Sequence, residues 1–311
     1  MLPISIKLPD SFLNEEVRCG FLITHEKKKI WAVELDLLNE FIKVCHEYHL
    51  GFYAAGGTLL GAVRHKGIIP WDDDIDIMMF RDDFDKLCKI APKAFIYPYF
   101  FQTEETDPGS YRGHAQLRNS QTTGILKKEI HQKKKINQGI FIDIFPLDAI
   151  PDNQKEFTIY RKRLMLLRKK YIKYLRYSYP YKFCFRKNLF LLFYDYLQHF
   201  FISYATAKRK CASIYRQYDK CLQSLRGIDS QRVMMTPFLT DRWIWNRSDL
   251  KGIVEMPFEM MNLPVPEGYE EILSVIYGNW HEYIIGSSVH GDILFDADKS
   301  YTEYLNNYND R

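Results

Sequence analysis

The sequence has no paired or clustered cysteines. Six cysteines are scattered over 311 residues, without a Cys-x-x-Cys pair and without histidines at zinc-finger spacing. This pattern gives no support to a disulfide framework or a structural zinc site. It fits a protein of a reducing compartment.

Long apolar runs and a leader-like N-terminus are also missing. The densest apolar run, residues 189–194, ends at Asp195 and is much shorter than the roughly 20 residues that cross a bilayer as a helix. The first residues, MLPISIK, lack a basic region followed by an apolar stretch. We therefore expect no secretory signal, a mature chain that begins at Met1, and a cytoplasmic location.

Charge is distributed unevenly along the chain. Residues 155–226 contain 18 Lys and Arg against 3 Asp and Glu, whereas the rest of the chain contains 25 against 36. This asymmetry predicts an acidic body that can hold cations and a basic segment that can approach an anionic surface.

Hydrophobic periodicity predicts an α/β fold. Apolar residues recur at helical spacing over residues 27–50, with a charged opposite face. Residues 51–55 predict a short strand, which leads through Gly56 and Gly57 into a helix capped by Thr58. After a loop, residues 74–79 alternate acidic and apolar side chains as a half-buried strand does.

Two acids share one face of that strand. Residues two apart on a strand lie roughly 6.5 to 7 Å apart, so Asp74 and Asp76 can reach one or two shared cations. An isolated Asp-x-Asp is most often a solvated turn. Here Ile75 and Ile77 draw the acids toward the core, where carboxylates are costly unless a cation neutralises them. An EF-hand is excluded, because Ile77 occupies the position that requires glycine.

A third acid, Asp143, lies inside the strongly apolar run GIFIDIFP, residues 139–146. Taken alone, it could be a strand-end cap. Together with the acid pair and the glycine turn at a helix start, it predicts a site for phosphoryl chemistry. A helix N-terminus attracts phosphate, and three carboxylates can hold two Mg²⁺ ions for in-line displacement at phosphorus.

The motifs that carry this site closely resemble the LicD family of phosphotransferases, to which the fukutin-related proteins are distantly similar. The resemblance rests on GGTLLGAVRH (56–65), IPWDDDIDI (69–77), DIFPLD (143–148) and EMPFE (255–259). It implies a nucleotidyltransferase-type mixed sheet flanked by helices, with Mg²⁺ or alternatively Mn²⁺ as the cofactor. It also implies transfer of phosphocholine, or a related alcohol phosphate, from CDP-choline or a related CDP-alcohol. The acceptor would be a hydroxyl of a cell-surface or lipid-linked glycan, such as teichoic acid or lipopolysaccharide, with release of CMP.

The resemblance assigns roles to the acids. It makes Asp74 and Asp76 the metal-binding pair, and Asp143 the third metal ligand and the base for the attacking hydroxyl. Asp72 is a fourth candidate ligand, with stabilisation of the loop as the alternative. Asp73 is interpreted as a solvated neighbour.

The remaining predicted site residues concern the donor phosphates. Gly56, Gly57 and Thr58 would lie along these phosphates, with a plain tight turn as the alternative. Arg64 is a candidate for a bidentate phosphate contact, with a surface salt bridge as the alternative. Arg118, on a predicted strand between the acid-bearing strands, is a second phosphate candidate.

Three regions follow from these observations: a catalytic core (1–150), a basic and aromatic helical insertion (151–230), and a C-terminal part that packs on the core (231–311). Aromatic and leucine side chains recur at helical spacing from Phe190 to Tyr204. This stripe predicts peripheral attachment to an anionic membrane surface at its inner face, with inward packing as the alternative. Nucleic acid is not expected as a partner.

Two other functions share these motifs. A nucleotidyltransferase could add a nucleotide to RNA or to a small molecule, and its basic insertion would then grip nucleic acid. A non-catalytic scaffold of glycan assembly could retain the fold, but the intact acids argue against it.

Overall fold

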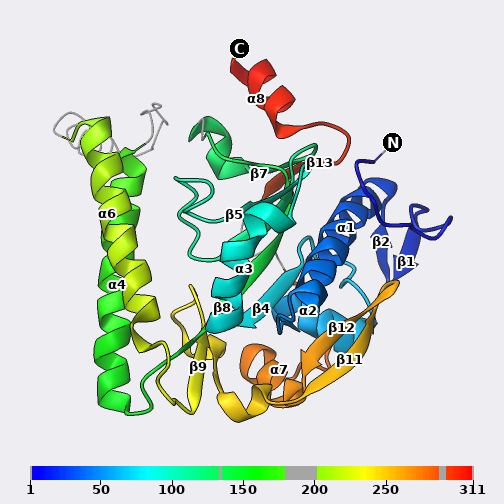
Figure 1. Ribbon diagram of the computed structural model, residues 1–311. Helices are drawn as coiled ribbons and strands as arrows, with labels where there is room; N and C mark the ends of the chain where they lie inside the picture. The colour runs from blue at the N-terminus through cyan, green and yellow to red at the C-terminus, as the bar shows by residue number, and fades with distance from the viewer. Residues whose placement is uncertain (1, 133–134, 179–201, 287–291, 310–311) are drawn as a thin grey trace.

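The computed structural model describes residues 2–132, 135–178, 202–286 and 292–309 (Figure 1). At its centre is a seven-stranded mixed sheet in the order β10-β9-β8-β4-β3, with β6 beside β8 and β5 beside β6. Its strands are β3 (Tyr53–Ala54), β4 (Asp76–Phe80), β5 (Tyr99–Gln102), β6 (Ala115–Asn119), β8 (Ile140–Ala149), β9 (Arg232–Met235) and β10 (Ile244–Asn246). The predicted α/β fold with a mixed sheet is confirmed.

The long strand β8 organises the sheet. β4 pairs with it in parallel, so the antiparallel partners β6 and β9 share its other edge, β6 along the first half and β9 along the last residues. The parallel register places Asp76 opposite Asp143. Two acids that are 67 positions apart in the sequence therefore become direct neighbours. Strand β6, which carries Arg118, lies beside β8 and not between β4 and β8.

Helix α1 (His25–Glu47) confirms the helix predicted over residues 27–50. Its N-cap residue Thr24 accepts a hydrogen bond from the amide of Lys27 at 3.3 Å. Two charged residues of this helix, Glu34 and Asp36, are fully buried. The neighbouring helix α3 (Arg81–Ala94) follows β4 directly and packs on β4, β5 and β8.

The helix after the glycine turn begins earlier than predicted. Helix α2 spans Gly56–Leu60, follows Ala55 as its N-cap residue, and continues into the π-helix η1 (Gly61–His65). Thr58 therefore lies inside the helix and is not its cap. Its hydroxyl instead accepts a hydrogen bond from the amide of Asp76 at 2.8 Å, which joins α2 to the first residue of β4. That strand begins at Asp76, so the predicted strand start at Asp74 is wrong, and Asp74 lies in the preceding loop.

Smaller elements surround the sheet. Two-stranded ladders join β1 (Glu16–Arg18) to β2 (Phe21–Ile23), β11 (Ile253–Phe258) to β12 (Met261–Pro266), and β7 (Thr123–Leu126) to β13 (Ile293–Asp296). Helix α7 (Tyr269–Tyr277) ends before Gly278, and α8 (Tyr301–Asn309) lies near the C-terminus. Short 3-10 turns are η2 (Lys127–Gln132), η3 (Gln223–Leu225), η4 (Asp241–Trp243) and η5 (Arg247–Leu250).

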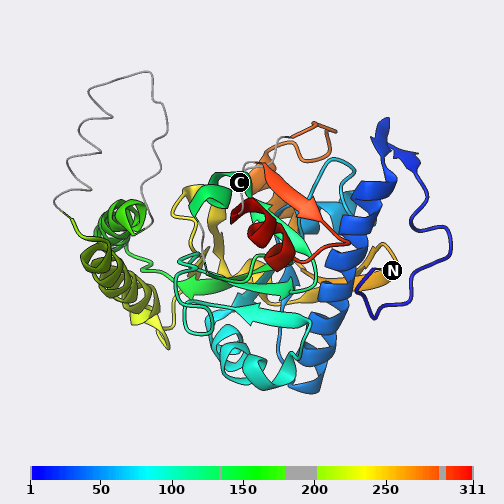
Figure 2. The same cartoon turned by 90° about the horizontal axis from the view of Figure 1, so that it is seen from above.

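The basic segment forms a helical pair at one side of the sheet, which stands apart from the sheet in both views (Figures 1 and 2). Helices α4 (Gln154–Tyr177) and α6 (Tyr204–Leu222) run antiparallel, and the hydroxyl of Tyr160 donates to the carbonyl of Leu222 at 3.3 Å. Their facing sides bury a second apolar core rich in aromatic residues, including Phe157, Tyr171 and Tyr218. The predicted aromatic stripe lies outside the described residues except for Tyr204, which is 53 % exposed.

None of the helices in the described part of the chain is both long enough and apolar enough to cross a membrane.

Candidate active site

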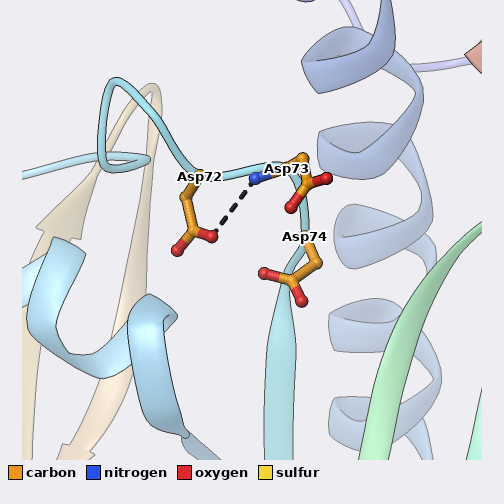
Figure 3. A group of neighbouring side chains, drawn as sticks. All are labelled: Asp72, Asp73 and Asp74. Carbon is orange, nitrogen blue, oxygen red and sulfur yellow. Dashed lines mark hydrogen bonds between the residues drawn. The ribbon is translucent and has the colours of Figure 1, made fainter. Parts of the chain in front are cut away.

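Three consecutive acids lie in the loop that enters β4. One carboxylate oxygen from each of Asp72, Asp73 and Asp74 can be chosen so that all three lie within 4.8 Å of one another. Figure 3 shows the three side chains between α2 and α1, with the amide of Asp73 donating to Oδ1 of Asp72 at 3.2 Å. Asp73, which the sequence suggested was a solvated neighbour, is therefore part of the cluster.

Asp76 and Asp143 extend this acidic cluster into the sheet. They are paired across the parallel ladder of β4 and β8, where neighbouring strands lie roughly 4.8 Å apart. Oδ1 of Asp76 is buried and has no hydrogen-bond partner. Asp143 is 3 % exposed. The structure thus brings the predicted acids Asp72, Asp74, Asp76 and Asp143 into one region.

The two glycines of the turn allow the acids to approach α2. A Cβ atom on Gly56 would lie 2.9 Å from Oδ2 of Asp76, and one on Gly57 would overlap Oδ2 of Asp72. Gly56 also has a φ of +50°, which side chains rarely adopt. Both glycines are therefore required for the carboxylates to sit against the start of the helix.

Burial and crowding disfavour the charged forms of these acids. Burial, and then the charges of Asp74 and Asp143, raise the pKa of Asp76 well above its ordinary value. Burial, the charge of Asp74 and a hydrogen bond with Asp74 likewise raise the pKa of Asp72. A bound cation would reverse this effect, because it favours the ionised carboxylates.

A buried glutamate on α1 belongs to the same electrostatic environment. Glu34 is fully buried, and neither of its carboxylate oxygens has a hydrogen-bond partner. Burial, and then the charges of Asp74 and Asp73, raise its pKa well above its ordinary value. The same helix contacts the acidic loop through Trp31, whose indole N–H donates to the carbonyl of Asp72 at 3.4 Å.

Asp143 is oriented by neighbours from β6 and the preceding loop. Its Oδ1 accepts a hydrogen bond from Nε2 of Gln116 at 2.5 Å and lies 3.2 Å from Nε2 of His114. Arg118 donates to Oε1 of Gln116, which fixes the orientation of that amide. Two consecutive hydrogen bonds, from Arg118 to Gln116 and from Gln116 to Asp143, therefore fix the orientation of the Asp143 carboxylate.

Arg118 is itself an interior residue. It is 1 % exposed, and its guanidinium also donates to Oε1 of Gln102 and to the carbonyl of Gly139, both at 2.7 Å. Burial lowers its pKa to about 9, so it still carries a charge near neutral pH. These contacts use its donors within the protein, and its predicted contact with the donor phosphates stays a prediction.

Arg64 joins η1 to the C-terminal segment. Its Nη1 donates to the carbonyls of Trp280 and Glu282 at 2.6 and 2.7 Å, and its guanidinium lies over the ring of Tyr283 at 4.8 Å. Within the described residues Arg64 forms no salt bridge of the kind given as the alternative, and its predicted contact with phosphate stays a prediction. In this arrangement Arg64 fastens residues 280–283 beside the turn.

The donor groups fit Mg²⁺. Every candidate ligand is a carboxylate oxygen, the type of ligand that hard divalent cations prefer. The unpartnered Oδ1 of Asp76 is the kind of buried polar atom that a cation would satisfy. On this basis Asp72, Asp74, Asp76 and Asp143 would hold the metal, as proposed from the sequence.

Three residues near the acids were not assigned to the site from the sequence. Glu34 was part of a predicted helix face. The ring of Trp243 lies 3.7 Å from the position of a Cβ on Gly56. Burial, and then the charges of Asp76 and Asp72, raise the pKa of Tyr277. Only the tertiary fold brings these residues to the acids, so no local signal identifies them.

Comparisons with known proteins are concentrated in the same part of the chain. Residues 49–186 match the LicD/FKTN/FKRP nucleotidyltransferase domain, a segment that contains all of the predicted site residues. The chain is 34 % identical over 122 residues to the lipopolysaccharide cholinephosphotransferase LicD of Haemophilus influenzae, which covers 39 % of this chain and 44 % of that protein.

Two further relatives match over 60 residues, which is 18 % of this chain. An uncharacterised protein of Rickettsia prowazekii is 43 % identical over 23 % of its length, and one of Rickettsia typhi is 42 % identical over 19 % of its length. The chain thus spans less than half the length of each of these relatives.

Proposed function

Because this chain belongs to the LicD family through residues 49–186, we propose that it is a Mg²⁺-dependent phosphotransferase. It would move phosphocholine, or a related alcohol phosphate, from a CDP-linked donor to a hydroxyl of a cell-surface glycan and release CMP. The observation that carries the proposal is the pairing of Asp76 with Asp143 on parallel strands beside the glycine turn. The similarity to a lipopolysaccharide cholinephosphotransferase supports choline and a glycan acceptor.

The reaction needs a base for the acceptor hydroxyl, a site that positions the donor phosphates, and positive charge near the phosphoryl oxygens. The acceptor hydroxyl would attack the phosphorus distal to the cytidine, and its proton would pass to a carboxylate oxygen of Asp143. The bond from that phosphorus to the bridging oxygen would break, and CMP would leave with the oxygen. Mg²⁺ bound to the acids would supply positive charge at the transferring and leaving phosphoryl oxygens.

The protein side of this step is the orientation of Asp143. Gln116 and His114 constrain its Oδ1, and Arg118 constrains Gln116 in turn. A general base that is held at one angle loses little entropy at the transition state. The glycine turn would bring backbone N–H groups of α2 close to the donor phosphates.

The helical pair offers a surface for the acceptor side of the reaction. On α4, Ile159 and Leu166 are 70 % and 53 % exposed, and the exposed cations Lys162, Lys169 and Lys173 lie along the same stripe. Basic residues near an anionic leaflet contribute roughly 1 kcal/mol each. We propose that this stripe attaches the enzyme to the inner face of a membrane that carries a lipid-linked glycan.

Product identity tests the proposed function. Purified protein would be incubated with Mg²⁺, CDP-choline and a lipopolysaccharide or teichoic acid preparation, and nucleotides would be separated by chromatography. We expect CMP and a choline-labelled glycan. Pyrophosphate release from a nucleoside triphosphate, with no CMP from any CDP-alcohol, would instead establish a nucleotidyltransferase.

Membrane attachment is tested separately by co-sedimentation with vesicles of phosphatidylcholine alone or with phosphatidylserine. We expect binding only to the anionic vesicles, and weaker binding as salt rises. Replacement of Lys169 and Lys173 by Glu should abolish it, whereas the same replacement of the exposed Lys251 should not. Equal binding by both variants would contradict a role for α4.

A further inference from the structure

A continuous aromatic surface begins at the acid pair. Phe145 follows Asp143 by two residues on β8, so both side chains leave the strand on the same face. The ring of His114, which contacts Asp143, lies against Phe145 with the ring centroids 4.5 Å apart. The aromatic surface therefore starts in contact with the proposed base.

The same surface returns to the other acid of the pair. The ring of Phe238 lies 5.3 Å from that of Phe145, and Trp243 stacks on Phe238 at 4.6 Å with an angle of 21° between the planes. The edge of Trp243 then lies 3.7 Å from the position of a Cβ on Gly56, and Oδ2 of Asp76 lies 2.9 Å from that position. The rings thus connect the two paired acids.

Two of these rings can be reached by a ligand. Phe145 is 2 % exposed, but Phe238 and Trp243 are only partly buried. In the described part of the chain, the cations that are recorded over aromatic rings lie over other rings, for example Arg247 over Phe80. The stacked pair of Phe238 and Trp243 is therefore an aromatic surface beside carboxylates, and no cation from the described residues lies over either ring.

We propose that Phe238 and Trp243 bind the quaternary ammonium of the donor, and so make this enzyme selective for choline over ethanolamine. The proposal rests on the proposed function. Quaternary ammonium groups bind to the faces of aromatic rings, and tryptophan is the best partner. The neighbouring carboxylates favour a cation further. A primary ammonium is strongly hydrated and gains less from rings.

The experiment compares two donors that share cytidine and both phosphates. CMP release from CDP-choline and from CDP-ethanolamine would be measured for the wild type and for Trp243→Leu, Phe238→Leu and Trp243→Phe. A cation–ring contact in a partly desolvated site predicts that each leucine variant lowers the ratio of the two kcat/KM values, choline over ethanolamine, about tenfold. Trp243→Phe should retain most of the ratio because it keeps a ring.

The outcomes are separable. If the wild type releases CMP from neither donor, the proposed function fails before the inference is reached. If the wild type is active and both donors lose the same factor in the leucine variants, the rings contact the nucleoside or only support the fold, and the inference is overturned. Thermal melting identifies a variant that does not fold. Phe238→Leu and Trp243→Phe then still decide the question, because they act on different rings of the pair.

Discussion

Replacement of Asp76 by asparagine should stabilise the metal-free protein and weaken its response to Mg²⁺. The Oδ1 atom of Asp76 is buried without a partner, and burial and neighbouring carboxylates raise its pKa. Asparagine has nearly the same shape and no charge. It therefore removes repulsion from Asp74 and Asp143 in the folded state, while it also removes one negative ligand from the proposed metal site.

The direction in which stability changes with pH follows from the raised pKa of Asp76. A carboxyl whose folded pKa lies above its unfolded value contributes stability below the unfolded pKa, about 3.9 for aspartate. That contribution is lost as pH rises through the folded pKa. In EDTA, the wild type should therefore lose more stability than Asp76→Asn as the pH rises from the unfolded pKa through the folded pKa of Asp76.

The size of the metal effect can be bounded. Mg²⁺ at about 100 times its dissociation constant stabilises the native state by roughly 2.7 kcal/mol. For a chain of this size, the melting temperature moves about 2 °C for each kcal/mol. We therefore expect Mg²⁺ to raise the melting temperature of the wild type by about 5 °C, and that of Asp76→Asn by much less.

Differential scanning fluorimetry in EDTA and in Mg²⁺ measures both effects. Asp10→Asn is the matched control, because Asp10 is exposed and should leave both melting temperatures unchanged. If Asp76→Asn melts lower than the wild type in EDTA, Asp76 belongs to a structural ion pair and the reasoning is wrong. An undiminished response to Mg²⁺ would show that the ion binds elsewhere.

Three other substitutions test the surroundings of the acids. Gly57→Ala should lower turnover by up to about 100-fold with little loss of melting temperature, because the new Cβ displaces Asp72; steady-state kinetics would show this, and normal turnover would count against Asp72. Gln116→Leu should destabilise the protein by roughly 1.5 to 3 kcal/mol in urea unfolding, because it removes one hydrogen-bond donor from the buried carboxylate of Asp143. Arg81→Met removes the bidentate partner of Asp148, a buried carboxylate on β8. The loss should lower the free energy of unfolding by roughly 3 to 5 kcal/mol in the same assay. A loss below about 1 kcal/mol would mean that the remaining charge is solvated.

The local elements of the fold were predictable because their signals lie in short stretches of sequence. The helical period over residues 27–50 gives α1, and the apolar run around Asp143 gives β8. The start of α2 was misplaced, because Thr58 looks like a cap in the sequence. In the structure its hydroxyl accepts a hydrogen bond from the amide of Asp76, a contact that depends on a strand 18 residues away.

The position of the acids could be predicted from the sequence better than the contacts of the arginines. Asp74 and Asp76 are close in sequence, and the apolar neighbours of Asp143 reveal its burial. Arg118 was a phosphate candidate because it lies on a predicted strand between the acid-bearing strands, whereas in the structure it donates to Gln102, Gly139 and Gln116. Partners of that kind come from separate strands, and no periodicity in the sequence encodes them.

The most direct test of the central proposal is CMP release from CDP-choline by the wild type and by Asp143→Asn, with Mg²⁺ or with EDTA. We expect release by the wild type only with Mg²⁺, and a rate at least about 100-fold lower for Asp143→Asn, while the melting temperature of this variant stays at or above that of the wild type. Release by Asp143→Asn within about twofold of the wild-type rate, or release that persists in EDTA, would contradict the assignment of Asp143 and of the metal site.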